Sequence, residues 1–323
     1  MCTSLTFTTE HTYFGRNLDL EYHFGQQVVI TPRNYPFSFR AMPALEKHHA
    51  IIGMATVAEG YPLYAEGVNE KGLYMAGLNF PGNACYPCGP ENGTPAAPYE
   101  LIPWLLGTCD SVDQAEEKLR SVRILDTPFA PNMPNAPLHW HLADGRRALV
   151  AEPMADGLKL FEDPVGVLTN NPTFDFHLTN LNQYMGLSAA QPENRFGGME
   201  LRPFGQGMGT LGLPGDWSPA SRFVRAAFLK WNSACQGDQA SSVSQVFHIL
   251  DAVAMPRGAV RTPEGKWDIT DYSCCIDGRT GTYYYKTYDN SQITAVPMDE
   301  AKREGAALIC HPLVTEQQFR IVP

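Results

Sequence analysis

The chain has 323 residues, of which 44% are hydrophobic and 18% charged, a composition typical of a folded globular protein and not of a disordered one. Its net charge is −10, with 24 Lys and Arg against 34 Asp and Glu. Because no basic cluster is present, nucleic acid is not expected as a partner. The longest apolar runs, such as residues 50–57, are much shorter than the roughly 18 residues of a membrane-spanning helix. The first twenty residues lack the basic and apolar segments of a secretory signal, so we expect a cytoplasmic protein.

Cys2 directly follows the initiator methionine. A small second residue allows the cell's aminopeptidase to remove Met1, which would leave a thiol and a free α-amino group on one residue. The thiolate is the nucleophilic form of cysteine, and an α-amino group can accept a proton near neutral pH. Nucleophile and base could then lie on the same residue, as in enzymes with an N-terminal threonine. The alternative is an inert terminus, since many proteins begin with Met-Cys by chance.

The residues after Cys2 favour the catalytic interpretation. Residues 3–7 predict a short strand, which would hold the terminus in place. The next predicted strand contains Arg16 and Asp19 within the sequence FGRNLD. A carboxylate can orient an α-ammonium group, and an arginine close to a thiol favours the thiolate. The alternative is that both side chains lie on the surface and contribute little.

Apolar and β-branched runs predict the early strands, at residues 28–31, 50–58 and 72–79. A loop with several prolines follows, at residues 83–98. Helices are predicted at residues 98–106 and 111–122, the second beginning with a capping box of Ser111 and Gln114. The next four predicted strands are residues 138–142, 148–152, 158–161 and 166–169.

A later helix is predicted to begin with Ser218 as its N-cap and Pro219 in its first position, and to end near residue 231. Another is predicted at residues 243–253. The last predicted strands are residues 267–275, 283–288, 292–296 and 307–310. Strands and helices do not alternate singly, which argues against a doubly wound parallel sheet. We expect an α+β protein with antiparallel sheets covered by helices, formed as one domain by residues 1–323.

Several motifs point to cofactors but lack the context that these would need. Residues 85–88 have CxxC spacing without a second pair of ligands, and we expect the eight cysteines to be free thiols. Residues 207–212 match GxGxxG, but a proline follows where a dinucleotide site needs a helix, so we predict a glycine-rich loop. His139 and His141 would share one face of a strand and lack the helical spacing of a zinc site. We therefore expect no metal and no cofactor.

Two asparagines and an arginine are further candidate site residues. Asn79 ends a predicted strand, and Asn170 follows another, each before turn residues. Donors at such positions can stabilise an oxyanion when they are already aimed at the developing charge. Arg222 lies in the first turns of the helix that follows the glycine-rich loop. The alternatives are ordinary turn asparagines and an arginine on a solvated helix face.

Taken together, these segments resemble the choloylglycine hydrolase family, which comprises bile salt hydrolases and penicillin V acylases. The motifs that carry the resemblance occur in order over nearly the whole chain: MCT, FGRNLD, AGLNFPGNA, VLTNNPTFD, GLPGD, SRFVRA and YYYKTYDNSQITAV. Each motif is modest alone, but the ordered set is specific. The resemblance implies an N-terminal-nucleophile hydrolase fold, a four-layer αββα sandwich.

The resemblance also implies roles for individual residues. Cys2 would be the nucleophile and its own α-amino group the base. Arg16 and Asp19 would orient and polarise that terminus. A second set, from later motifs, would act on the oxyanion and on the thiol: Asn79 and Asn170 in the oxyanion hole, and Arg222 beside the charged sulfur. Asn171 is not implied, because the family's motif places the catalytic asparagine first.

The asparagine at position 79, in AGLN, resembles the bile salt hydrolases of the family, because penicillin V acylases often carry tyrosine at this position. The resemblance therefore implies hydrolysis of glycine- or taurine-conjugated bile acids, such as glycocholate and taurocholate, by a homotetramer in a gut bacterium. Aromatic loops would line the apolar cleft that a steroid needs. The substrate-contacting residues expected are Tyr22, Phe24, Tyr61, Tyr64 and Phe129, with Gly205 and Gln206 influencing glycine or taurine selection.

Two alternatives remain at this point. One is penicillin V acylase or acyl-homoserine-lactone acylase activity from the same residues. The other is a ligand-binding protein without activity, in which Met1 is retained and Cys2 has no free amine. The intact mass of the protein distinguishes the second alternative, because only the retained methionine would block the proposed base.

Overall fold

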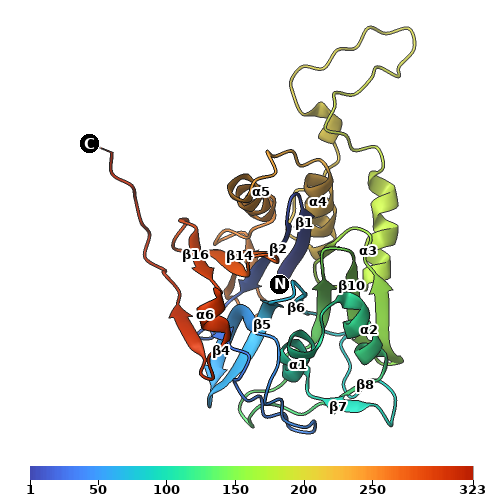
Figure 1. Cartoon of the computed structure of the whole chain (residues 1–323). Helices are drawn as coiled ribbons and strands as arrows, with labels where there is room; N and C mark the ends of the chain where they lie inside the picture. Colours follow the sequence, from blue (N-terminus) through green and yellow to red (C-terminus); the bar gives the residue numbers. More distant parts are fainter. Residues whose placement is uncertain (323) are drawn as a thin grey trace.

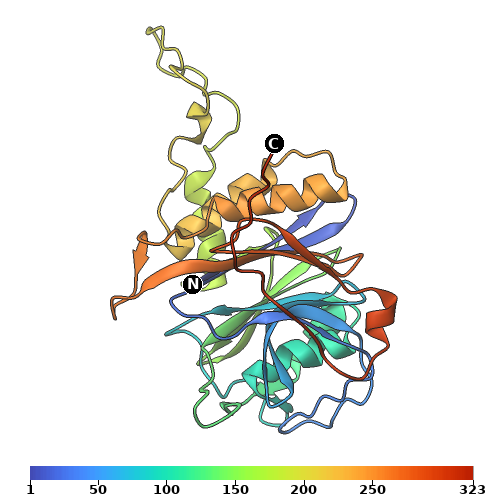
Figure 2. The ribbon, with the colours of Figure 1, turned by 90° about the vertical axis from the view of Figure 1, so that its left-hand side faces the viewer.

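The computed structural model describes residues 1–322 (Figure 1). Two antiparallel sheets lie face to face, with a layer of helices outside each of them (Figure 2). This is the four-layer αββα sandwich implied by the resemblance. The outer helices are α1 (Leu101–Thr108), α2 (Val112–Arg120), α4 (Pro219–Trp231) and α5 (Gln239–Asp251). Among the described residues, no helix has the length and apolar character needed to cross a membrane.

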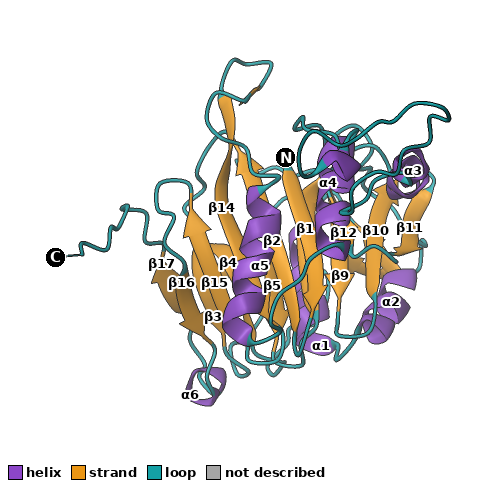
Figure 3. Cartoon of the chain, turned by 90° about the horizontal axis from the view of Figure 1, so that it is seen from above, coloured by secondary structure: helices purple, strands orange, loops and turns teal. Residues whose placement is uncertain are grey.

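The first sheet joins the beginning of the chain to its end. Its strand order is β12-β1-β2-β14-β15-β16, and β13 pairs with β14 at one end. The strands are β1 (Cys2–Thr8), β2 (Thr12–Leu20), β12 (Val167–Leu168), β13 (Val260–Arg261), β14 (Trp267–Asp277), β15 (Thr282–Thr287) and β16 (Thr294–Pro297). In Figure 3, α4 and α5 lie across its central strands.

The second sheet has eight strands in the order β11-β10-β9-β6-β5-β4-β3-β17. They are β3 (Gln27–Thr31), β4 (Ile51–Ala58), β5 (Tyr61–Asn69), β6 (Tyr74–Asn79), β9 (Leu138–Ala143), β10 (Ala148–Met154), β11 (Gly157–Glu162) and β17 (Ile309–Pro312). Helices α1 and α2 pack on its outer face. A separate parallel pair is formed by β7 (Thr94–Ala96) and β8 (Val122–Ile124).

Alternation along the strands divides the core into two clusters. On β6, Tyr74 and Ala76 point into the cluster that contains Cys2, and Met75 points into the cluster under α1 and α2. The first cluster fills the space between the sheets and extends under α5. There the helix approaches β2 so closely that a Cβ at Gly15 would lie 2.7 Å from Val246 Cγ1. Only glycine allows this packing of α5 on the FGRNLD strand without a shift.

Most elements predicted from the sequence are confirmed. The α2 N-cap is Ser111, whose side chain accepts from the Gln114 amide, and the α4 N-cap is Ser218, followed by Pro219. The segment predicted as one helix at 98–106 is a 3₁₀ turn, Pro98–Glu100, followed by α1. Pro103 lies in the first turn of α1, where its missing amide hydrogen has no helical partner to lose.

Several elements were not predicted, and the two longest are a strand and a helix. Residues around Tyr61 and Tyr64 were expected in a loop, and this is wrong, because they belong to the nine-residue strand β5. Pro62 and Glu66 interrupt the apolar pattern that marks a strand, which hid it from sequence analysis. Helix α3 (Phe174–Asn180) and a following 3₁₀ turn, Leu181–Tyr184, were also missed. The remaining short elements are a 3₁₀ turn, Met208–Thr210, and α6 (Glu300–Arg303).

Candidate active site

Cys2 is the first residue of β1, an inner strand of the first sheet, and only 3% of its surface is exposed. Strand β2 runs antiparallel beside it, with Cys2 opposite Leu18 and Ser4 opposite Arg16. This register brings the Arg16 side chain to the thiol, and Arg16 Nη2 donates to Cys2 Sγ at 3.4 Å. The short hairpin between β1 and β2 therefore places a cation beside the sulfur.

Arg16 is held by the second sheet. Its Nη1 forms a buried ion pair with Glu66 on β5, 2.5 Å away, and donates to the Ala65 carbonyl, while Nη2 donates to the Gly77 carbonyl. Glu66 also accepts hydrogen bonds from the hydroxyls of Tyr272 and Tyr283. Burial opposes the charge of Arg16, but the Cys2 thiol and Glu66 raise its pKa well above the ordinary value. Arg16 thus stays cationic at the sulfur.

Arg222, from the first turns of α4, contacts the backbone of Cys2. Its Nη1 donates to the Cys2 carbonyl and to Thr3 Oγ1, and its Nη2 donates to Asn170 Oδ1 at 2.7 Å. The Trp217 carbonyl accepts from Nε at 3.0 Å. Burial lowers the pKa of this arginine, and Asp19, whose Oδ2 lies 3.9 Å away, acts against that shift. Arg222 therefore fixes the chain at Cys2 and does not contact the sulfur.

Asn170 lies just beyond β12 and connects three of the predicted residues. Its Oδ1 accepts from the Cys2 backbone nitrogen at 2.8 Å and from Arg222, and its Nδ2 donates to the Asn79 carbonyl at 2.6 Å. Asn79 is the last residue of β6. Asn171 instead donates to the Pro81 carbonyl and is turned away from this cluster. The Asn170 side chain therefore connects Cys2 of the first sheet with Asn79 of the second.

Asp19 is fully buried near the N-terminal end of β1. Its Oδ1 accepts from the Thr270 hydroxyl at 2.6 Å, but its Oδ2 has no hydrogen-bond partner in the described chain. Met1 precedes Cys2 in the structure, and the Met1 amine donates to the Asp19 carbonyl and lies 3.5 Å from Asp268. A buried carboxylate oxygen without a hydrogen-bond donor is unfavourable, and the ion pair of Asp19 with Arg222, at 3.9 Å, offsets this only in part.

Residues 2–310 match the family described as linear amide C–N hydrolases, choloylglycine hydrolase family. The chain belongs to the choloylglycine hydrolase family. It is 46% identical to the bile salt hydrolase/transferase of Lactiplantibacillus plantarum, with all of both chains covered. It is also 42% identical to the bile salt hydrolase/transferase of Clostridium perfringens, over 94% of each chain.

Solved structures agree with this membership. A mutant conjugated bile acid hydrolase from Clostridium perfringens gives a TM-score of 0.92 at 40% identity, with all of both chains covered. Penicillin V acylase from Agrobacterium tumefaciens gives a TM-score of 0.77 at 19% identity, over 98% of this chain and 94% of that chain. At this lower identity the likeness concerns the fold alone.

In this choloylglycine hydrolase family member, the fold gathers the six residues named as catalytic from the sequence. They come from four regions of the chain: Cys2, Arg16 and Asp19 from β1 and β2, Asn79 from β6, Asn170 from beyond β12, and Arg222 from α4. Hydrogen bonds join five of these residues, and Asp19 lies 3.9 Å from Arg222 as an ion pair. The family motifs, which are far apart in the sequence, therefore meet at the start of β1.

The residues expected to contact substrate are less closely grouped. Tyr61, Tyr64 and Phe129 pack in the cluster under α1 and α2, on the other face of the second sheet from Cys2. The Tyr64 hydroxyl is bonded there to Thr31 at 2.7 Å. Phe24 packs at the edge of the cluster that contains Cys2. The structure therefore brings Phe24, but not these three aromatic residues, to the face of the sheet that carries the site.

Tyr22 is half exposed and lies just beyond the end of β2, the strand that carries Arg16 and Asp19. Gly205 and Gln206 lie in the long segment between α3 and α4, which projects from the body of the molecule (Figure 1). Their contacts there are with Gln191, whose side chain donates to the Gly205 carbonyl and to Gln206 Oε1. The structure does not bring these two residues together with Cys2.

The residues that hold these six candidate catalytic residues in place were not predicted from the sequence. Glu66 binds Arg16, and Thr270 binds Asp19. His177 on α3 donates from Nε2 to the Asn170 carbonyl at 2.8 Å. Of these residues, only Glu66 has a recognisable sequence signal, because it is an acidic residue among apolar and small residues in YAEGV. Thr270 and His177 carry no such signal, because their roles depend on how distant elements meet.

Proposed function

We propose that this protein hydrolyses the amide bond of glycine- or taurine-conjugated bile acids. The observation that carries the proposal is the position of Cys2, with its sulfur against Arg16 and its backbone nitrogen against Asn170. Full-length relatives at 46% and 42% identity are named bile salt hydrolase/transferase, which supports this substrate class. The amide reaction itself agrees with the description of the family, linear amide C–N hydrolases.

The proposed mechanism requires removal of Met1, which frees the amine of Cys2. That amine would lie beside Asn170 Oδ1, which accepts from the Cys2 nitrogen at 2.8 Å. Asp19 would orient the ammonium form after it accepts the proton from the thiol. Arg16 would stabilise the resulting thiolate, and Arg222 would fix the Cys2 backbone from the other side. In this assignment Arg16 stabilises the charged sulfur, a role that the family resemblance implied for Arg222.

The thiolate would attack the amide carbonyl carbon of the substrate and form a tetrahedral oxyanion. Asn79 and Asn170, which are joined by the hydrogen bond from Asn170 Nδ2 to the Asn79 carbonyl, would donate to that oxygen. Collapse of the intermediate would break the C–N bond, with the α-ammonium group giving its proton to the departing glycine or taurine nitrogen. Water, deprotonated by the same amine, would then hydrolyse the thioester. These steps need only side chains and the terminus of this chain.

Product release measured by mass spectrometry tests the proposal. Glycocholate, taurocholate and penicillin V would be incubated in parallel with the reduced protein after removal of Met1 has been verified. We expect glycine and taurine to be released faster than the penicillin V side chain. Faster release from penicillin V would place the activity in the acylase branch. Absence of release from all three substrates would contradict both assignments.

We further propose that the protein is a homotetramer that works in the cytoplasm. The segment between α3 and α4 exposes apolar side chains far from the core, and self-association would cover them: Met185, Phe196, Met199, Leu201, Phe204 and Leu211. All eight cysteines are free in the described chain, which suits a reducing compartment. The pairing of β2 with β14 supports one domain over residues 1–323, because the two strands come from opposite ends of the chain.

A further inference from the structure

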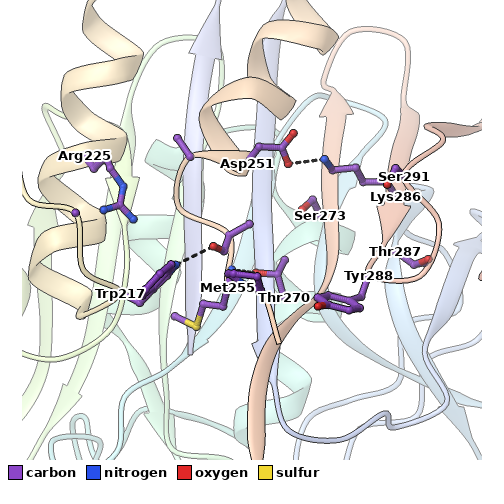
Figure 4. A pocket seen from close by; sticks show the side chains of 14 residues that line it. Trp217, Arg225, Asp251, Met255, Thr270, Ser273, Lys286, Thr287, Tyr288 and Ser291 are labelled. Carbon is purple, nitrogen blue, oxygen red and sulfur yellow. Dashed lines mark hydrogen bonds and ion pairs between the residues drawn. The ribbon is translucent and has the colours of Figure 1, made fainter. Parts of the chain in front are cut away.

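A cavity lies on the helix-covered face of the first sheet, next to the beginning of α4 and the end of α5 (Figure 4). Its volume is about 620 Å³. It is lined by Trp217 and Arg225 on one side and by Lys286 and Tyr288 on the other, with Met255 between them. None of the residues assigned above to catalysis lines this cavity. It is therefore separate from the site at Cys2.

Arg225 is the unusual residue of this cavity. Only 8% of its surface is exposed, and its Nη1 donates to the carbonyls of Pro214 and Asp216 at 2.8 and 3.2 Å. Its Nε has no partner, and the guanidinium forms no ion pair with a carboxylate of the described chain. The charge of Asp216 acts on Arg225, but burial outweighs it and lowers the pKa of the arginine, and both Asp216 carboxylate oxygens accept from Ser218 and Ser221. Buried charges in proteins are normally paired, so the guanidinium of Arg225 is suited to bind an anion.

The rest of the cavity indicates what kind of anion fits. Lys286 pairs with Asp251, and its ammonium lies 5.6 Å from the ring centre of Phe247, so Arg225 is left as the excess positive charge. Trp217, Met255 and Tyr288 supply apolar walls that a small inorganic ion would leave uncovered. The volume falls in the range of about 300–1,000 Å³ that is typical of sites for small organic ligands.

We propose that this cavity binds an amphipathic organic anion, with its carboxylate or sulfonate on Arg225 and its apolar body against Trp217 and Tyr288. Two residues of its wall contact the catalytic set. The Trp217 carbonyl accepts from Arg222, and the Thr270 hydroxyl donates to Asp19. A ligand in the cavity would therefore touch the residues that hold Arg222 and Asp19 in place.

Calorimetric titration with cholate tests this inference, and the choice of probe rests on the proposed function. Cholate carries a carboxylate on a steroid and has no conjugated amide to be hydrolysed. The protein without Met1 would be compared with Arg225→Gln, and with Ser291→Trp, which fills the cavity from its exposed rim. Ser244→Trp, an exposed residue of α5 outside the cavity, is the matched control. Ser291→Trp keeps the test valid if Arg225→Gln does not fold.

We expect the wild type and Ser244→Trp to bind one more cholate per chain than Ser291→Trp, and Arg225→Gln to bind that cholate at least about tenfold more weakly. Equal stoichiometry and affinity in all four proteins would overturn the inference. Glycine release from glycocholate, measured in the same samples, separates it from the proposed function. An Arg225-dependent cholate site in a protein that releases no glycine would leave the cavity assignment standing without the hydrolase assignment.

Discussion

The contact between Arg16 and Cys2 depends on a residue from the other sheet. Glu66 is the only carboxylate in the described chain that pairs with Arg16, and it is fully buried. Without this pairing, Arg16 would be a buried cation held only by two carbonyl groups and the sulfur. Glu66 is therefore a positioning residue that acts through Arg16.

We expect Glu66→Gln to lower kcat/KM for glycocholate about 10- to 100-fold, because a hydrogen bond to a charged group is worth about 1.5–3 kcal/mol. Alkylation of Cys2 by iodoacetamide at pH 7 should slow as well, since Arg16 would be less firmly held at the sulfur. Glu66→Asp should restore part of both rates. Mass spectrometry of the alkylated N-terminal peptide measures the second effect.

The matched control is Glu152→Gln. Glu152 is an equally buried glutamate on β10, and its Oε1 is bonded to His139 at 3.1 Å and not to Arg16. This change should destabilise the fold and leave the Cys2 alkylation rate unaltered. If both variants slowed alkylation equally, the effect of Glu66 would be one of general stability and not of positioning.

At the scale of elements, helix α3 holds the loop that carries Asn170. His177 is fully buried, stacks on Phe223 of α4 with ring centres 4.8 Å apart, and donates to the Asn170 carbonyl. Burial lowers the pKa of His177 to about 4. The folded state therefore resists protonation of a group that the unfolded chain protonates near pH 6.5. Acid should therefore destabilise the fold at α3, because protonation places a charge on a buried ring.

Because the pKa of His177 is lower in the folded state than in the unfolded chain, acid lowers the free energy of unfolding. The stabilising contribution of neutral His177 is complete above pH 6.5 and is lost as the pH falls through about 4. We expect the free energy of unfolding to fall by up to about 3 kcal/mol more in wild type than in His177→Gln between pH 7 and 4. Urea unfolding at several pH values measures this difference. Parallel pH curves for the two proteins would show that His177 is not the responsible group.

Most of the elements could be predicted from the sequence because they depend on local patterns, and the motifs also named six residues that the fold brings together at the start of β1. Ser218-Pro219 predicts the start of α4 through its own capping, and the FGRNLD motif carries Arg16 and Asp19 together. The partners of those residues could not be predicted in this way. Whether Glu66 meets Arg16 depends on how two sheets are stacked, and no local pattern contains that information. The same reason explains why Tyr61 and Tyr64, once placed in β5, pack on the face away from Cys2.

At the scale of the whole molecule, the segment between α3 and α4 exposes large apolar side chains that the rest of the chain does not cover. Phe204 is 94% exposed and Phe196 69% exposed, although both are large apolar residues. We expect the double variant Phe196→Ser, Phe204→Ser to shift the protein from tetramers to smaller species, because it removes apolar area that association would bury. Light scattering after size-exclusion chromatography measures the mass.

The control for this prediction is Phe319→Ser, in the C-terminal tail. Phe319 is also apolar and 78% exposed, but it lies outside the projecting segment. The control should keep the wild-type mass. A wild-type protein that is monomeric at all concentrations would contradict the proposed tetramer, and a tetramer that survives the double change would place the interface elsewhere.

The proposed mechanism requires that Cys2, freed of Met1, forms a thioester with the acyl group of a conjugated bile acid. Acid quenching of the enzyme during turnover of glycocholate, followed by mass spectrometry of its N-terminal peptide, tests this claim most directly. We expect a peptide that begins at Cys2 and carries one cholyl group, which disappears once substrate is exhausted. Rapid release of glycine by a protein whose N-terminal peptide still begins with Met1, or never carries the cholyl group, would contradict it.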